Sequence, residues 1–142
     1  MAVYVLDTSA VVAFVREEPG EQEVSDLLER AQSEEGLRLL LPFMVLMEIE
    51  YVLLRTYPRD VTEATLAIMG SWPIEVIESH QRWRRAAAHV KASYRLSLGD
   101  AWIAALALLE DADLVHKDPE FDAVPGLKAL RLPDNQGSPE PA

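Results

Sequence analysis

The sequence predicts an α/β fold in which helices sandwich a parallel sheet. Short apolar runs typical of buried strands alternate along the chain with segments of helical periodicity. The first run, "AVYVL", is apolar on both faces, as a strand covered by helices on both sides must be. The length of 142 residues fits a single domain, which we place at residues 1–132.

The order of the elements follows from periodicity and from Pro and Gly positions. Residues 21–36 place Val24, Leu27 and Leu28 on one stripe with an acidic outer face, which predicts an amphipathic helix. Strands are predicted at 2–6, 37–41, 73–78, 113–117 and, at the sheet edge, 127–132. Helices are predicted at 8–20, 21–36, 43–57, 59–71, 80–95 and 97–111, and a turn that can include one helical turn at 118–125. Residues 133–142 are rich in Pro, Gly and polar residues, which predicts a disordered tail.

Composition limits the possible chemistry. The chain has no cysteine and 3 histidines, so disulfides, thiolate metal sites and histidine-rich zinc sites are excluded or disfavoured. Any metal is expected on carboxylate oxygens, which favours Mg²⁺, Mn²⁺ or Ca²⁺. The net charge of −11 argues against a protein that coats nucleic acid and suits a basic partner. Neither a signal peptide nor a membrane helix is recognisable, so we expect a soluble, cytoplasmic protein.

Two acidic residues lie where strands end. Asp7 directly follows the first strand and Asp118 follows "LVHK". Each has a simple structural explanation, since aspartate caps helices and an Asp-Pro step makes turns. However, ligands of α/β folds bind outside the carboxyl ends of the strands. The positions of these two residues therefore predict a functional site.

Helices contribute further carboxylates. Glu48 and Glu50 lie in an almost wholly apolar helix, and helix phase alone does not decide which faces the interior. Asp100 stands three residues after Ser97, so it completes a capping box or projects over the sheet ends toward Asp7. Four converging carboxylates repel one another, at about 4 kcal/mol per pair at 4 Å for an effective dielectric near 20. Such a site raises carboxyl pKa values or holds divalent cations.

Four segments that contain these acidic residues together resemble the PIN-domain nucleases, and most closely the VapC-like toxins of toxin–antitoxin pairs. The resemblance rests on "VLDTSAVVAF", "VLMEIEYVL", "LSLGDAWIAALAL" and "LVHKDPEF", in the family's order and spacing over nearly the whole chain. It implies a three-layer α/β/α sandwich around a mostly parallel sheet, and a divalent-metal endoribonuclease using Mg²⁺ or Mn²⁺. It also implies an RNA substrate, a cognate antitoxin and a homodimer.

Carried over by position, the resemblance assigns catalytic and metal-binding roles to four residues, Asp7, Glu48, Asp100 and Asp118. Asp7 and Asp100 are expected as the core ligands. Ser9 and Glu120 match accessory positions. The family often has Thr two residues before the last aspartate, where this chain has His116. That departure keeps Asp118 but bears on how the groups around the metal or a substrate phosphate are held.

The only dense cluster of basic residues lies in the helix predicted at 80–95. We interpret Arg84, Lys91 and Arg95 as RNA-binding residues beside the acidic cleft. A solvated helix face is the commoner explanation of such a charge run, and the residues could equally serve an acidic partner. Two other functions stay open: an RNA-processing PIN nuclease without antitoxin, and a non-catalytic PIN-like binding module. An aspartate-nucleophile phosphatase is disfavoured, because Ser9 stands where a second Asp is usual.

Overall fold

A computed structural model describes residues 2–33 and 36–135 and has the predicted α/β/α architecture. Five parallel strands form one sheet in the order β3-β2-β1-β4-β5. The strands are β1 (Val3–Leu6), β2 (Arg38–Pro42), β3 (Glu75–Ile77), β4 (Asp113–His116) and β5 (Lys128–Arg131). The helices are α1 (Thr8–Val15), α2 (Glu21–Gln32), α3 (Phe43–Thr56), α4 (Arg59–Met69), α5 (Gln81–Ser93), α6 (Leu98–Leu109) and the short 3₁₀ helix η1 (Pro119–Ala123).

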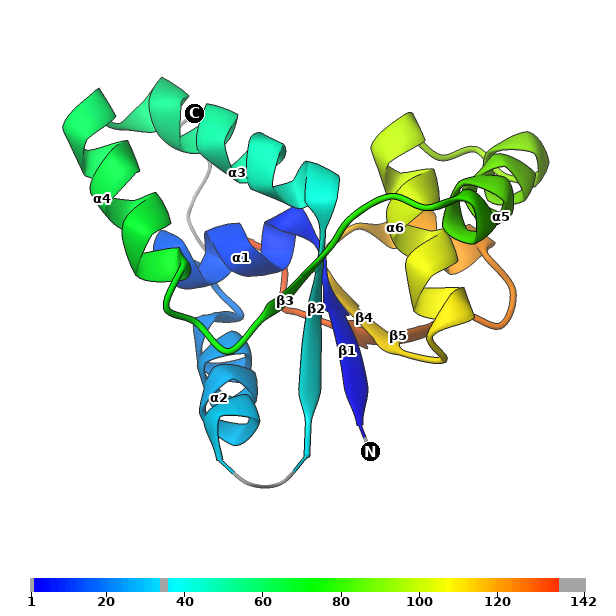
Figure 1. Ribbon diagram of the computed structural model, residues 1–142, viewed down its shortest axis with the longest axis horizontal. Helices are drawn as coiled ribbons and strands as arrows, with labels where there is room; N and C mark the ends of the chain where they lie inside the picture. Colours follow the sequence, from blue (N-terminus) through cyan, green and yellow to red (C-terminus); the bar gives the residue numbers. More distant parts are fainter. Residues whose placement is uncertain (1, 34–35, 136–142) are drawn as a thin grey trace.

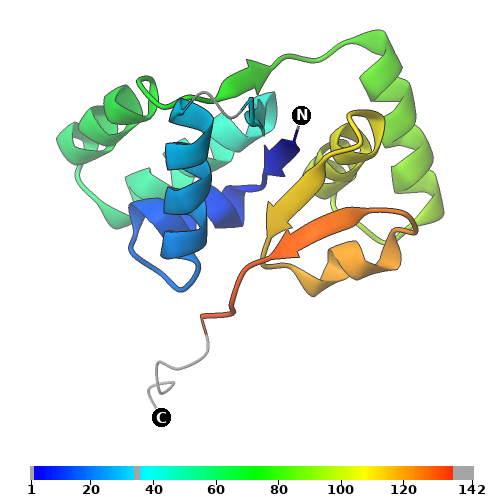
Figure 2. The same ribbon diagram turned by 90° about the horizontal axis from the view of Figure 1, so that it is seen from below.

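The helices lie on two sides of the sheet. In Figure 1, α1 to α4 stand on one side and α5 and α6 on the other, with the segment that includes β3 crossing between them. The view from below shows β4 and β5 side by side, with η1 connecting them (Figure 2). Helix α1 packs on β1 and β4, while α6 packs on β1, β2 and β4 from the opposite face. The central strands are therefore covered on both faces, which explains their continuous apolar runs.

The predicted elements are all present, with differences at their ends. The first helix stops at Val15 rather than at Gly20, because Arg16 leaves helical geometry and Glu17 has a positive φ of 55°. Helix α2 ends at Gln32, and β5 lies at the sheet edge as expected. Within the described ranges no helix is long and apolar enough to cross a membrane. Of the predicted tail, 136–142 lie outside the described residues, and 133–135 are in neither helix nor strand.

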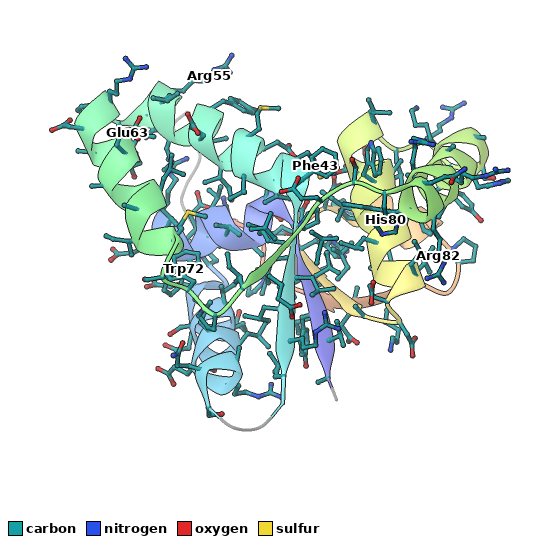
Figure 3. The ribbon with its side chains drawn as sticks, viewed as in Figure 1. Phe43, Arg55, Glu63, Trp72, His80 and Arg82 are labelled. Carbon is teal, nitrogen blue, oxygen red and sulfur yellow. The ribbon has the colours of Figure 1, made fainter. Side chains whose placement is uncertain are left out.

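An aromatic cluster joins three helices. Trp83 of α5 is fully buried and its Nε1 donates to the Trp102 carbonyl of α6 at 2.7 Å. Phe43, at the start of α3, lies edge-on to both indoles, with ring centroids 5.6 Å from Trp83 and 5.4 Å from Trp102. Figure 3 shows Phe43 at the end of α3 that approaches α6, with Arg55 at its far end. These contacts fix the first turns of α3 and α6 relative to each other.

Candidate metal centre

Four carboxylates from four elements line one cavity at the carboxyl edge of the sheet. Asp7 follows β1, Asp118 follows β4, Glu48 lies in the second turn of α3, and Asp100 lies in the first turn of α6. All four border a cavity of about 480 Å³. Parallel strands end at the same edge, and the helices that follow them start there, so residues far apart in sequence meet.

Asp7 is the most buried of these carboxylates, with only 7% of its surface exposed. It caps α1: Oδ2 accepts from the Ser9 amide at 3.3 Å and from the Ser9 hydroxyl at 2.6 Å. The Ser9 oxygen in turn accepts from the Lys117 amide at 3.2 Å, which ties the ends of β1 and β4 together. Burial raises the pKa of Asp7, although the Ser9 hydrogen bonds oppose the shift. Capping and a place in the cavity are thus compatible roles for one side chain.

Asp100 lies close enough to the other three carboxylates for their charges to affect its pKa. Its amide donates to Ser97 Oγ at 3.1 Å, so Ser97 caps α6 as the sequence predicts. Burial is the main cause that raises the pKa of Asp100 to about 7, and the charges of Asp7, Asp118 and Glu48 add to it. An Asp100 carboxylate is therefore destabilised at neutral pH unless a cation is near.

The structure decides between the two glutamates of α3. Glu48 borders the acidic cavity, whereas Glu50 is exposed and borders only a separate apolar depression on α3. Burial raises the pKa of Glu48, and the Asp7 charge raises it further. A Cβ atom added to Gly99 would lie 3.7 Å from Glu48 Oε1, so the first turn of α6 lies directly beside this carboxylate.

Glu120, which was assigned an accessory position, is exposed and lies beside two of the four carboxylates. Asp118 caps η1, with Oδ1 accepting from the Glu120 amide at 2.9 Å, and this turn brings the Glu120 side chain back toward Asp100. One oxygen from each of Asp100, Asp118 and Glu120 lies within 4.8 Å of the others. The donor set is made of hard oxygens with several negative charges, which fits Mg²⁺ or Mn²⁺. Asp7 and Glu48 complete the acidic lining of the same cavity.

His116 is buried beneath the site. Only 1% of its surface is exposed, its ring lies 4.8 Å from Phe121, and Nδ1 has no hydrogen-bond partner among the described residues. Burial lowers the pKa of His116 despite the nearby Asp7 charge. The imidazole is therefore neutral at neutral pH and contributes packing rather than positive charge.

Lys117 was not singled out from the sequence, although it directly precedes Asp118. Lys117 lines the acidic cavity, and its ammonium group lies 3.7 Å from Glu18 Oε1 and donates to Asn135 Oδ1. Glu18 follows the end of α1, and Asn135 follows β5. No local pattern indicates these contacts, because they depend on how three separate segments end at the same edge of the sheet.

The predicted RNA-binding residues lie elsewhere. Arg84 and Lys91 border a groove between α5 and α6, and Arg95 follows the end of α5 without lining it. None of the three lines the acidic cavity. The structure thus separates an acidic site from a basic surface, with the first turns of α6 between them.

Comparisons with known proteins agree with this architecture. A family model described as PIN domain matches residues 4–127. Among solved structures, VapBC2 from Rickettsia felis bound to a promoter DNA fragment superposes with a TM-score of 0.74 at 20% identity, covering 92% of this chain and 99% of that chain. DNA-bound VapBC from Salmonella typhimurium gives 0.76 at 18% identity, covering 92% and 98%. VapC20 from Mycobacterium tuberculosis, a sarcin-ricin loop cleaving toxin, gives 0.65 at 18% identity, covering 90% and 98%. No curated protein sequence matches the chain.

Proposed function

The chain belongs to the PIN domain family, and from this premise we propose that it is a divalent-metal-dependent endoribonuclease and the toxin of a type II toxin–antitoxin pair. One observation carries the nuclease proposal: carboxylates that follow β1 and β4 share a cavity with carboxylates of α3 and α6, and the pKa of Asp100 is raised there to about 7. A cluster this unfavourable in isolation is suited to binding cations. Mg²⁺ or Mn²⁺ is the cofactor that fits its oxygen donors.

Each residue has a role that follows from its position. A divalent ion held by these carboxylates would lower the pKa of a bound water and would supply positive charge to the phosphodiester. Asp7 and Asp100 are the proposed core ligands of the metal. Glu48 and Asp118 complete this set of ligands or orient it. Glu120 adjoins Asp100 and Asp118. Ser9 holds the Asp7 carboxylate through its 2.6 Å hydrogen bond. Glu48, whose pKa is raised, is suited to accept a proton from the attacking water.

The nuclease proposal is tested by cleavage of a mixed RNA panel with purified protein in Mg²⁺, Mn²⁺ or EDTA. We expect metal-dependent cleavage that falls at least about a hundredfold in Asp7→Asn and Asp100→Asn, since even removing a group that only orients a ligand costs 10–100-fold. Glu48→Gln should also lose activity. Glu50→Gln is the matched control, because it changes the same charge on the exposed side of the same helix. Equal activity of Glu48→Gln and Glu50→Gln would contradict the role of Glu48.

The toxin assignment is supported by the VapBC complexes among the structural neighbours and by a net charge of −11, which suits a basic partner. We expect the product of an adjacent short reading frame to bind the chain and to suppress its RNA cleavage. Cleavage that no adjacent gene product inhibits would point instead to RNA processing without an antitoxin.

A homodimer is also proposed, on the basis of exposed apolar side chains along α3. Met47, Tyr51 and Leu54 are 63%, 44% and 45% exposed. Contiguous apolar surface of this kind is typical of protein interfaces. Light scattering of the wild type and Met47→Glu tests this proposal: the wild type should have twice the chain mass and the variant a lower mass.

A further inference from the structure

A groove between α5 and α6 has an apolar floor and a basic rim. It has a volume of about 390 Å³ and is floored by alanines of both helices, with Leu98 and Trp102 beside them. Arg84 and Lys91 stand at its border, and no acidic residue is among the described side chains that line it. Leu98, which is 68% exposed, extends this apolar surface to the first turn of α6. The groove therefore combines an apolar surface with positive charge.

The basic side chains on and just after α5 have no partner among the residues that the structure describes. Elsewhere, Arg38 pairs with Glu75 and Arg131 with Asp122. Across the part of the chain that the structure describes, neither a hydrogen bond nor an ion pair is found for the side chains of five basic residues on or just after α5, namely Arg82, Arg84, Arg85, Lys91 and Arg95. In a chain with 24 acidic and 13 basic residues, this leaves a local positive surface available to an external anion.

The groove continues toward the acidic cavity. A second cavity, of about 520 Å³, shares Leu98 and Trp102 with the groove and reaches Glu48 and Gly99. Trp102 borders both, and its ring is held edge-on to Trp83 at 4.9 Å. A rigid indole beside an apolar floor is a surface on which a nucleobase can stack. An extended polymer can thus run from the carboxylates across the first turn of α6 to α5.

We propose that this groove binds an unpaired nucleotide of the RNA substrate, with the base on the apolar floor and the adjacent phosphates on Arg84 and Lys91. Bases inside an A-form duplex are stacked and paired, so a protein surface of this kind takes only a base that has been unstacked. The inference rests on the proposed ribonuclease function and adds to it a base-binding site between α5 and α6, outside the acidic cavity.

The test is direct binding, measured in EDTA so that it does not depend on cleavage. Fluorescence anisotropy would compare three probes: a labelled single-stranded oligoribonucleotide, the same strand annealed to its complement, and the same strand with abasic spacers at successive positions. We expect the intact single strand to bind most tightly. Loss of base stacking should weaken binding about tenfold.

Variants locate the binding on the molecule. Arg84→Gln should weaken single-strand binding about tenfold. It should also lower the slope of the affinity against salt concentration by about one, which corresponds to one phosphate contact. Arg59→Gln is the matched control: Arg59 also has no internal partner among the described residues, but it lies on α4, away from the groove. Ala88→Leu fills the floor at an exposed helical position without changing charge, and should weaken the intact strand but not the abasic one.

Several outcomes would overturn the inference. Equal binding of intact and abasic strands would show that the groove holds no base. Equal effects of Arg84→Gln and Arg59→Gln would leave only a general electrostatic attraction. If Ala88→Leu instead changed the oligomeric state in solution, or the affinity for an acidic peptide, the groove would belong to a protein interface. If the protein bound RNA in a base-dependent way but cleaved none with any metal, the nuclease proposal would fail and the groove assignment would stand. If it cleaved RNA but bound intact and abasic strands equally, the groove assignment would fail and the nuclease proposal would stand.

Discussion

The acidic cavity and the basic surface of α5 are both clusters of like charge, but they arise in different ways. The carboxylates come from four elements separated by up to 111 positions, Asp7 to Asp118, and only the fold brings them together. The basic residues come from one helix and the residues just after it. Figure 3 shows Arg82 of α5 on the outside of the molecule. The first cluster is partly shielded from water, and the second is exposed.

This difference decides what each cluster costs the folded protein. Exposed charges are screened by water and salt, so the cations of α5 repel one another only weakly. The carboxylates are partly removed from water, and burial raises the pKa of Asp7, Glu48 and Asp100. The acidic cavity therefore lowers the stability of the metal-free protein at neutral pH, whereas the basic surface does not. A cation bound in the cavity should recover that stability.

The largest expected effect is stabilisation by metal. At a Mn²⁺ concentration of about a hundred times its dissociation constant, binding to the folded state alone contributes about 2.7 kcal/mol. Thermal unfolding with and without Mn²⁺ should show a higher Tm with metal near pH 8 and a much smaller shift near pH 4, where protons compete for the carboxylates. The stabilisation should be lost in Asp100→Asn and kept in Arg84→Gln. An equal Tm shift in both variants would locate the metal outside the cavity.

The next effect concerns the metal-free protein and its pH dependence. The pKa of Asp100 is about 7 when folded and 3.8 in the reference state, so the folded state holds more protons between these values. The contribution of Asp100 to stability therefore falls as pH rises from about 4 to 7. Asp100→Asn cannot titrate and should stabilise the metal-free protein near pH 8 by about 1–2 kcal/mol, after allowance for solvent screening.

Urea unfolding in EDTA at several pH values measures this effect. Glu63→Gln is the control, since it removes one negative charge from the exposed face of α4, where Figure 3 labels the side chain. Its stability should follow that of the wild type across the pH range. A stability of Asp100→Asn that does not diverge from the wild type with rising pH would mean that the Asp100 carboxylate is well solvated.

Sequence patterns predicted the sheet and its helices because these depend on local periodicity and on parallel strands needing crossover helices. The strand ends pointed to Asp7 and Asp118, and the family resemblance added Glu48 and Asp100. The structure places the four in one cavity; their catalytic role stays a prediction. Helix periodicity alone did not decide between Glu48 and Glu50, since two residues two positions apart on an apolar helix differ only in what packs against them. Lys117 and Glu18 were missed for a similar reason: their contacts join segments that share no sequence pattern.

The smallest expected effect distinguishes the two clusters most cleanly. Arg84→Gln removes a charge that has no internal partner among the described residues, so it should change the free energy of unfolding by less than about 0.5 kcal/mol at any pH. The same variant should weaken RNA binding. Urea unfolding at about pH 5 and about pH 8 measures the stability. A pronounced gain in stability would mean that the α5 cations repel one another strongly enough to strain the fold. In that case the basic surface, like the acidic cavity, would require a counter-charge from a ligand.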